Sequence, residues 1–430
     1  MDIFTKLREI WQPGNQPFLI HDNTQIRFSD IAKAPGELAG IKPGDVVALI
    51  GDFDPCTLRT FLHLVERRTI VVPLTAANSQ SHEELLAIAG VDWIIENGEK
   101  RKVSRKEQKH ELVAQMAAEE KSAIVLFSSG ITGKPKGILL EISALTGATR
   151  SSNSSSRILT FLLFDHIGGL YTLTSMLNGR TLIAPQKRTP EAIMKACAKH
   201  KADTLPTTPT FLRLLLLGGL VPDHVPASLR TITYGTELMD ASTLTKLCKL
   251  LPKINFWQTY GMSELGIFKI QSEARDSLFM RIADPGCKTR VVDGQLHILS
   301  QRRMRGYLNA ASPFDKEGWY NTKDIVEQKG EFFRIVGRNS DLINVGGQKF
   351  MASQVEEVAL QIEGVVLAKA EGKSNPITGQ HAELVVQLAK PEDFDPVHIK
   401  RQIGLKLPPH MVPLKISCNK VPVSHRFKRG

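Results

Sequence analysis

A dense cluster of glycines, hydroxyls and lysines, SSGITGKPKG at 128–137, follows the apolar run 123–127. The glycines allow a tight turn that exposes backbone N–H groups, and the hydroxyls and lysines add donors and positive charge. Such a loop after a buried strand is suited to bind the phosphates of a nucleotide. A Walker A loop is excluded because Pro135 follows Lys134, where that motif needs Ser or Thr. A solvated surface hairpin is the alternative interpretation.

Five further segments carry carboxylates, hydroxyls, aromatic rings or cations of the kinds found at nucleotide sites. In chain order they are 234–238 (YGTEL), 258–264 (QTYGMSE), 318–324 (GWYNTKD), 337–347 (GRNSDLINVGG) and 422–428 (PVSHRFK). Together with the glycine-rich loop they resemble, in kind and order, the motifs of the adenylate-forming superfamily, which includes acyl-CoA synthetases, adenylation domains of peptide synthetases and luciferases. The sequence departs from that pattern at Ile131 and Ser263, where the family usually has threonine, and at Phe427, where it has glycine.

The resemblance implies that the protein joins a carboxylate to the α-phosphate of ATP. Both reactants are anions, so the enzyme must neutralise them and hold them in line. In this interpretation Lys428 is the catalytic cation that bridges the carboxylate and the phosphate. Glu264 is the catalytic carboxylate that binds Mg²⁺, because a hard cation prefers oxygen ligands. A solvent-exposed lysine and a charge at a helix N-terminus are the plainer alternatives for these two residues.

A larger set of residues is implied to bind ATP and AMP. Asp324 should accept hydrogen bonds from the ribose hydroxyls, and Arg338 should contact the same sugar. Tyr260 should stack on the adenine and Ser263 should donate to the α-phosphate. The full predicted set is Ser128, Ser129, Gly130, Thr132, Gly133, Lys134, Lys136, Gly137, Gly235, Thr236, Glu237, Tyr260, Gly261, Ser263, Asp324 and Arg338. For Asp324 and Arg338, surface ion pairs are the alternative.

The segment 163–169 (LFDHIGG) resembles the acid-pocket motif of the family and points to His166, Asp165 and Gly169. His166 either lines the pocket or is a buried histidine satisfied by the backbone. An alignment shifted by one residue would give Asp165 the role of holding a substrate ammonium group. Otherwise the acid has no α-amino group, and the motif at 258–264 favours that reading because it looks more like aryl- and acyl-CoA ligases.

The family completes a second step, in which a thiol attacks the adenylate after the small domain has rotated. Ser340 occupies the hinge position, which is usually Asp or Lys in the family. Gly346, Gly347 and Lys349 are expected to face the thiol, although Lys349 could equally be a surface lysine. The implied cosubstrates are ATP with Mg²⁺, and either CoA or the phosphopantetheine of a carrier protein.

Alternating strands and helices must position these segments. The apolar runs 45–50 and 69–74 predict buried strands, with a helix over 56–67 between them. We expect an α/β protein with a large N-terminal domain of mixed sheets and packed helices, 1–337, and a small, mobile α+β domain, 338–430.

Two local patterns predict further structure. Ser353 followed by Glu356 reads as a capping box that opens a helix. The stretch 100–109 contains six Lys or Arg residues and is expected to be a solvated helix or loop.

Composition narrows the partners of the chain. Its 430 residues carry a formal net charge of +11, which suits polyanionic ligands such as ATP and CoA. No basic stripe interleaved with aromatics is present, so nucleic acid is not favoured. The apolar run 212–221 is too short to span a bilayer. The five cysteines include no CxxC pair, which indicates a reducing cytoplasm rather than a disulfide framework.

The sequence therefore predicts a cytoplasmic ATP-dependent ligase that activates a small carboxylic acid, acyl or aryl, and transfers it to CoA with release of AMP and pyrophosphate. A standalone adenylation enzyme that loads an amino or aryl acid onto a carrier protein is the first alternative. A non-catalytic nucleotide-binding regulator is the second, and the joint presence of Lys428, Glu264, Asp324 and Arg338 argues against it.

Overall fold

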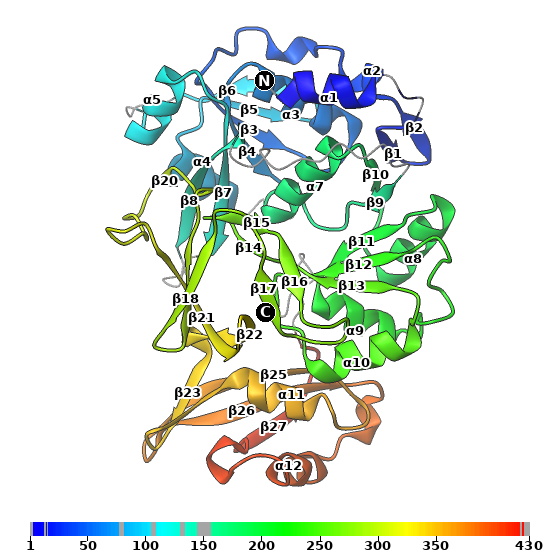
Figure 1. Cartoon of the computed structure of the whole chain (residues 1–430), viewed down its shortest axis with the longest axis vertical. Helices are drawn as coiled ribbons and strands as arrows, with labels where there is room; N and C mark the ends of the chain where they lie inside the picture. Colours follow the sequence, from blue (N-terminus) through cyan, green and yellow to red (C-terminus); the bar gives the residue numbers. More distant parts are fainter. Residues whose placement is uncertain are drawn as a thin grey trace.

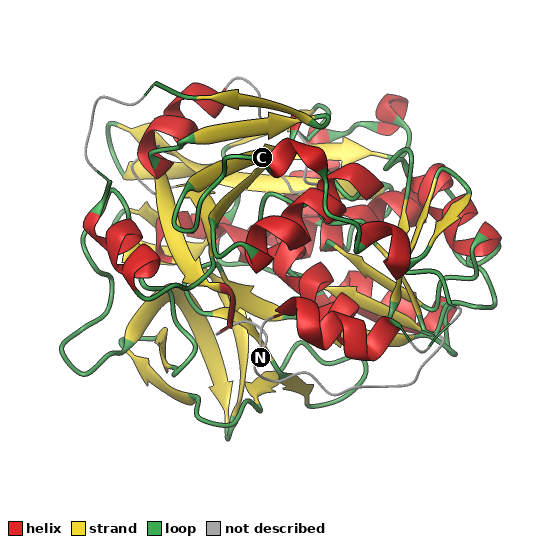
Figure 2. Cartoon of the chain, turned by 90° about the horizontal axis from the view of Figure 1, so that it is seen from above, coloured by secondary structure: helices red, strands yellow, loops and turns green. Residues whose placement is uncertain are grey.

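The computed structural model describes residues 3–12, 14, 16–76, 81–104, 109–129, 134–143, 156–421 and 424. Its strands form two seven-stranded sheets, a six-stranded sheet, a two-stranded hairpin and a five-stranded sheet. In Figure 1 the chain runs from the blue N-terminal elements at the top to the orange and red five-stranded sheet at the bottom. Viewed from above, helices gather at the centre and right, with long strands along the left (Figure 2). The predicted mixed α/β class is confirmed.

The first sheet carries the glycine-rich segment and has the strand order β20-β8-β7-β4-β3-β5-β6. Its strands are β3 (Val46–Ile50), β4 (Ile70–Leu74), β5 (Trp93–Glu96), β6 (Glu99–Lys102), β7 (Ala123–Ser129), β8 (Pro135–Glu141) and β20 (Gly306–Tyr307). The helices of this region are α1 (Ile3–Trp11), α2 (Phe28–Ile31), α3 (Pro55–Glu66), α4 (His82–Ala89) and α5 (Glu111–Ala118). β3 and β4 pair in parallel and are buried at every position, as expected for strands covered on both faces.

The basic stretch 100–109 is partly a strand, which corrects the sequence-based expectation of a helix or loop. Residues 99–102 form β6, which pairs antiparallel with β5 at the edge of the sheet. The Lys100 and Lys102 ammonium groups lie 5.1 and 5.5 Å from the centroid of the Trp93 ring. Lysines on an edge strand keep its free backbone groups from pairing with another chain, so the charge run is compatible with a strand there.

The second sheet has the order β13-β12-β11-β9-β10-β1-β2. Its strands are β1 (Leu19–His21), β2 (Thr24–Ile26), β9 (Arg157–Leu159), β10 (Thr181–Ala184), β11 (Thr204–Thr207), β12 (Thr231–Tyr234) and β13 (Asn255–Gln258), and its helices are α7 (Ile167–Leu177), α8 (Pro190–Lys199), α9 (Pro209–Leu217) and α10 (Ala241–Leu250). β11, β12 and β13 are parallel neighbours. Their carboxyl ends therefore meet at one edge, where ligands bind in open α/β sheets.

The third sheet is antiparallel and has the order β16-β17-β22-β21-β19-β18. Its strands are β16 (Ile270–Ser272), β17 (Met280–Ile282), β18 (Lys288–Val292), β19 (Gln295–Leu299), β21 (Tyr320–Lys329) and β22 (Phe332–Arg338), and the hairpin before it is β14 (Tyr260–Met262) with β15 (Gly266–Phe268). A shared apolar cluster that includes Tyr260, Phe268, Met280 and Phe333 packs the hairpin onto this sheet. The packing brings the 258–264 segment against β21.

The five-stranded sheet begins after β22 and has its own apolar core. Its strands are β23 (Leu342–Val345), β24 (Gln348–Met351), β25 (Val365–Asn375), β26 (Gly379–Leu388) and β27 (Lys415–Cys418), and its helices are α11 (Ala352–Ala359) and α12 (Pro396–Gly404). Single 3₁₀ turns occur in this part of the chain at Asn339–Asp341, Pro391–Asp393 and Pro409–Met411, and in the N-terminal region at Gly36–Leu38. The capping-box prediction is wrong. Met351 is the N-cap of α11, and its N–H donates to the Gln354 side chain at 2.9 Å. Ser353 lies inside the helix and donates to the Val336 carbonyl.

A buried ion pair fixes α9 against the start of α10. Arg213 and Asp240 side chains are 3% and 6% exposed, and Arg213 donates from Nη2 to Oδ2 of Asp240 at 2.6 Å. Asp240 also accepts the Thr243 N–H at 2.7 Å as the N-cap of α10. Burial acts to raise the pKa of Asp240, but Arg213 and the hydrogen bonds from Ser242 and Thr243 outweigh it and lower the pKa to about 2.

Asp240→Asn is therefore expected to destabilise the protein by about 3 kcal/mol, because Arg213 stays buried without its counter-charge. Urea denaturation measures this, with Glu331→Gln as the control, since the exposed Glu331–Arg281 pair should contribute less than about 1 kcal/mol. A folded-state pKa below the ordinary aspartate value of 3.8 gives stability that is present above pH 3.8. That contribution should be lost as the pH falls from 3.8 towards about 2. Equal denaturation midpoints for the two variants at neutral pH would contradict the assignment.

The five cysteines are free thiols, as expected from their spacing. No helix within the described ranges combines the length and apolar character needed to cross a membrane.

Candidate active site

Asp324 is the centre of a polar cluster in which three predicted residues meet, buried at Asp324 and Tyr260 and exposed at Arg338. It is 4% exposed, and its Oδ2 accepts a 2.7 Å hydrogen bond from the Tyr260 hydroxyl. Arg338, opposite Asp324 in the β21–β22 pair, donates from Nε to Oδ1 at 3.0 Å. Burial, and after it the Asp324 carboxylate, hold the pKa of Tyr260 well above its usual value. The Tyr260 hydroxyl therefore stays a donor, and one carboxylate orients both the ring and the guanidinium.

Glu264 forms a second cluster in the turn between β14 and β15. Its Oε1 accepts a 2.8 Å hydrogen bond from the Tyr307 hydroxyl, and Tyr320 lies close enough to interact electrostatically with both groups. Burial, and after it the Glu264 carboxylate, raise the pKa of Tyr307 and Tyr320. Because Tyr320 and Asp324 lie on one strand, β21 links this cluster to the first.

The glycine-rich segment joins the antiparallel strands β7 and β8, which pair from Ala123↔Glu141 to Ser129↔Pro135. The predicted residues Ser128, Ser129, Lys136 and Gly137 lie on these strands, and Lys134 directly precedes β8. Gly130, Thr132, Gly133 and Lys428 lie outside the described residues.

The Lys136 Nζ atom is 5.1 Å from the centroid of the Tyr307 ring. The hydroxyl of the same ring donates to Glu264. Lys136 of the loop and Glu264, the predicted Mg²⁺ ligand, are therefore both neighbours of Tyr307.

The 234–238 segment turns sharply at the end of β12. A Cβ atom on Gly235 would lie 2.2 Å from the Thr259 Oγ1 atom and 2.6 Å from the Thr259 carbonyl oxygen, so only glycine fits there. Thr236 has φ +69°, a left-handed conformation that costs a β-branched residue free energy and is typical of functional sites. The Glu237 carboxylate accepts the Thr210 N–H at 3.1 Å and its hydroxyl at 3.0 Å. Glu237 thus stabilises the N-terminus of α9.

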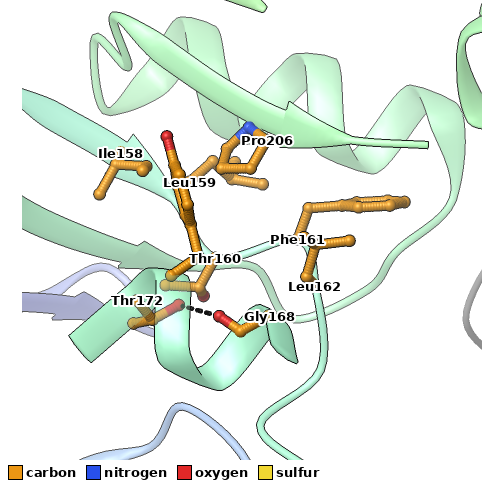
Figure 3. A pocket seen from close by; sticks show the side chains of 9 residues that line it. Ile158, Leu159, Thr160, Phe161, Leu162, Gly168, Thr172 and Pro206 are labelled. Atoms are coloured by element: carbon orange, nitrogen blue, oxygen red, sulfur yellow. Dashed lines mark hydrogen bonds between the residues drawn. The ribbon is translucent and has the colours of Figure 1, made fainter. Parts of the chain in front are cut away.

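Two adjoining cavities open between α7 and the second sheet. The larger of the two is lined by Leu162, Ile167, Gly168, Tyr171, Pro206, Thr207, Thr233, Thr236, Thr259, Tyr260, Gly261 and Ile267. The smaller one is drawn in Figure 3 and adds Ile158, Leu159, Thr160, Phe161 and Thr172. Thr236, Tyr260 and Gly261 belong to the predicted nucleotide set, so these cavities adjoin the place predicted for AMP. Ser263 is half-buried in the turn that also carries Glu264.

The three predicted acid-pocket residues lie just behind this lining. His166 is 4% exposed and is the N-cap of α7, where its Nδ1 accepts the Gly168 N–H at 2.9 Å. Asp165 is 3% exposed and its Oδ2 accepts a 3.2 Å hydrogen bond from the Thr75 hydroxyl. A Cβ atom on Gly169 would lie 2.5 Å from the Phe164 carbonyl oxygen. These residues shape the start of α7 rather than lining either cavity.

The side chains of α7 that do line the cavities were missed by sequence reasoning. Gly168, Tyr171 and Thr172 share one helical face, and the Thr172 hydroxyl donates to the Gly168 carbonyl at 3.0 Å (Figure 3). Their spacing of three and four residues is the signal that could have identified them. For Tyr307 no local signal exists, because its partner Glu264 lies 43 residues away.

The residues predicted for the hinge and the thiol lie in or beside the five-stranded sheet. Ser340 is in the turn after β22, and its hydroxyl donates to Asp341 at 2.9 Å. Gly346 and Gly347 have φ +59° and +87° in the β23–β24 hairpin, and Lys349 is exposed on β24. Figure 1 shows β23 at the lower left, away from β14 and β15, the hairpin whose turn carries Glu264.

Comparison with known proteins identifies matching relatives over most of the chain. The family model described as "AMP-binding enzyme" matches residues 36–313. A feruloyl-CoA synthase from Amycolatopsis sp is 22% identical over 92% of this chain and 90% of its own length. Surfactin synthase subunit 2 from Bacillus subtilis is 26% identical over 68% of this chain but only 9% of its own length. An anthranilate CoA ligase crystallised with anthranoyl-AMP superposes with a TM-score of 0.82 at 17% identity, covering 100% of this chain and 95% of that one.

Proposed function

Because the chain belongs to the AMP-binding enzyme family, we propose that it is an AMP-forming acid–thiol ligase. It activates a carboxylic acid as acyl-AMP and transfers the acyl group to CoA. The observation that carries the proposal is the linkage, through β21, of the Tyr260–Asp324–Arg338 cluster to Glu264. The first cluster provides acceptors and donors for a ribose, and the carboxylate of the second bonds Tyr307, whose ring neighbours Lys136 of the phosphate loop.

Each cluster has a role in holding ATP. Asp324 retains acceptor capacity beyond its bonds to Tyr260 and Arg338, since a carboxylate offers about four lone-pair directions. It accepts hydrogen bonds from the ribose hydroxyls, while the Gly235–Thr236 backbone flanks the adenine. Lys134 and Lys136 neutralise the β- and γ-phosphates, and Lys428 bridges the acid carboxylate and the α-phosphate.

The arrangement fits Mg²⁺ bound with its nucleotide. The described residues contain no group of three or more His, Cys, Asp and Glu that could form an all-protein metal site. Mg²⁺ usually takes one or two carboxylates and completes its shell with phosphate oxygens and water, so Glu264 alone is sufficient. When bound, the ion neutralises charge on the phosphates that leave as pyrophosphate. The hydrogen bond from Tyr307 holds the Glu264 carboxylate in place for that role.

Apart from its reacting carboxylate, the substrate acid is uncharged. The described residues that line the two cavities are apolar side chains, glycines, threonines and tyrosines, and none is charged. Burying an unpaired ammonium or second carboxylate in such a lining would cost several kcal/mol. Asp165 lies behind the lining and bonds Thr75, so it is poorly placed to hold a substrate ammonium. Aryl and apolar acids, with a hydroxyl or amine that the threonines can bond, match this surface.

The thiol step needs a rearrangement, because β23 lies away from β14 and β15, the hairpin whose turn carries Glu264. Rotation of residues 338–430 about Ser340 would bring the hairpin to the adenylate. Transfer to a carrier protein is the second candidate, which the match to surfactin synthase favours. We also propose that the protein is located in the cytoplasm.

Pyrophosphate exchange into ATP tests the proposal across a panel of acids. We expect exchange with uncharged aryl or apolar acids and at least about tenfold less with amino acids and dicarboxylates. Adding CoA or a phosphopantetheinylated carrier protein to the best acid then identifies the acceptor. ATP binding without exchange for any acid would instead support a non-catalytic nucleotide-binding regulator.

A further inference from the structure

The side chain of Asn309 forms hydrogen bonds with the backbone of the phosphate loop on both sides of Lys136. Its Oδ1 accepts the Gly137 N–H at 3.0 Å, and its Nδ2 donates to the Pro135 carbonyl at 2.9 Å. The partners fix the orientation of the amide, because an N–H can only donate and a carbonyl can only accept. Lys136 is thereby held between two anchored peptide groups.

Asn309 is in this position because β20 continues the sheet beyond β8. Gly306 and Tyr307 pair with Leu139 and Ile138, and the Leu308 N–H donates to the Gly137 carbonyl at 2.8 Å. The same antiparallel register places Asn309 opposite Lys136. Asn309 follows β20 by two residues, in a bend.

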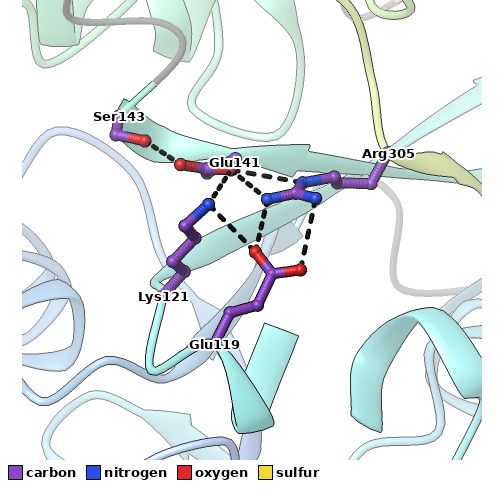
Figure 4. A network of polar contacts seen from close by, with 5 residues as sticks. All are labelled: Glu119, Lys121, Glu141, Ser143 and Arg305. Atoms are coloured by element: carbon purple, nitrogen blue, oxygen red, sulfur yellow. Dashed lines mark hydrogen bonds and ion pairs between the residues drawn. The ribbon is translucent and has the colours of Figure 1, made fainter. Parts of the chain in front are cut away.

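An ion-pair network fixes the other end of this segment. Arg305 donates to Glu119 at 2.7 Å and to Glu141 at 2.5 Å, and Lys121 contacts both carboxylates (Figure 4). The Arg305 N–H also donates to the Leu139 carbonyl at 2.8 Å. Glu141 ends β8 and Glu119 caps α5, so Arg305 ties β20 to two elements. A bidentate, networked arginine is the kind of surface ion pair that holds geometry.

Strand β20 and the bend that follows it therefore contact both parts of the phosphate site. Tyr307 bonds Glu264 and lies beside the Lys136 ammonium, while Asn309 fixes the peptide groups that flank Lys136. We propose that Asn309 is a positioning residue that presets the backbone of Pro135, Lys136 and Gly137, so that Lys136 is in place for the β- and γ-phosphates of ATP. The inference rests on the proposed function for the role of Lys136. Presetting matters because a backbone segment that is ordered before binding loses less conformational entropy when the ligand arrives.

Comparing ATP with AMP tests this assignment. AMP lacks the two phosphates that the loop holds, so Asn309→Ala should weaken ATP binding about tenfold and change AMP binding by less than about twofold. Asn309→Ser, which keeps one hydrogen-bonding group, should lose less ATP affinity. Calorimetric titration of the full chain with each nucleotide and Mg²⁺ gives both affinities without turnover. The result is therefore independent of whether any acid is activated.

Asn375→Ala is the matched control, because the Asn375 side chain likewise makes two hydrogen bonds to the backbone. It accepts both of them, from Ile377 and Thr378, in a turn of the five-stranded sheet. It should leave both nucleotide affinities unchanged. Equal losses of ATP and AMP affinity in Asn309→Ala would indicate a merely structural role and overturn the proposal. Unchanged ATP affinity in that variant would overturn it as well. Wild-type protein that binds ATP but activates no acid would count against the proposed function alone.

Discussion

Replacing Lys428 by alanine is expected to lower adenylate formation by about 10³-fold while leaving thiol transfer from a preformed acyl-AMP within about threefold of the wild type. In the first step two anions must approach, and removing a single preorganised charge from such a transition state typically costs 10²–10³ in rate. The second step needs no such approach, because the adenylate carbonyl is already activated. Pyrophosphate exchange measures the first step, and single-turnover transfer from synthetic acyl-AMP to CoA measures the second.

Lys420→Ala provides the matched control, since Lys420 is an exposed lysine in the same C-terminal segment. It should change neither rate. If Lys428→Ala slows both half-reactions equally, one face of the small domain serves both steps, and the proposed rotation about Ser340 is wrong.

Asp324→Asn should weaken ATP and AMP binding alike, each by about 10²-fold. The substitution removes the charge that pairs with Arg338 and replaces one acceptor oxygen of the carboxylate with a donor amide. Two charge-assisted hydrogen bonds are each worth about 1.5–3 kcal/mol, and the ribose is common to both nucleotides. Calorimetric titration with ATP and AMP measures the effect, which differs in kind from the ATP-selective loss expected for Asn309→Ala.

Asp293→Asn is a suitable control for this variant. Asp293 lies in the exposed turn between β18 and β19 with φ +50°, a conformation that asparagine tolerates equally well. An Asp324→Asn protein that loses ATP affinity but binds AMP normally would remove Asp324 from the sugar and place its role at the phosphates.

The elements with strong local patterns were predictable from the sequence. The apolar runs 45–50 and 69–74 became β3 and β4, and the helix expected over 56–67 became α3. α3 starts at Pro55 because Asp54 accepts the Thr57 N–H at 2.9 Å and proline suits the first helical position. In these segments local preference and burial agree, so the sequence alone is sufficient.

Where two local signals compete, the sequence was less reliable. Ser353 fits a capping box, but β24 runs directly into α11, and the hydroxyl is used by the Val336 carbonyl instead. The basic run at 100–102 reads as solvated, yet an edge strand keeps the same lysines in water. In both cases a tertiary contact decides the conformation, which no local pattern contains.

In the candidate site, too, local patterns predicted some residues, whereas others depend on tertiary contacts. The motifs predicted Tyr260, Asp324 and Arg338, and the structure brings the three together. Tyr307 and Asn309 were missed because they act through the pairing of β20 with β8, across more than 160 residues. The cavity lining depends on which face of α7 meets the second sheet, and so it emerges only from the fold.

The position at which ATP is cleaved tests the central claim most directly. With the best acid and CoA, products formed from ATP labelled on the α- and γ-phosphates should be AMP and pyrophosphate, each equal in amount to the thioester. Omitting CoA should leave one equivalent of acyl-AMP on the protein. Formation of ADP and inorganic phosphate in step with the thioester would show attack at the terminal phosphate and contradict the assignment of an AMP-forming ligase.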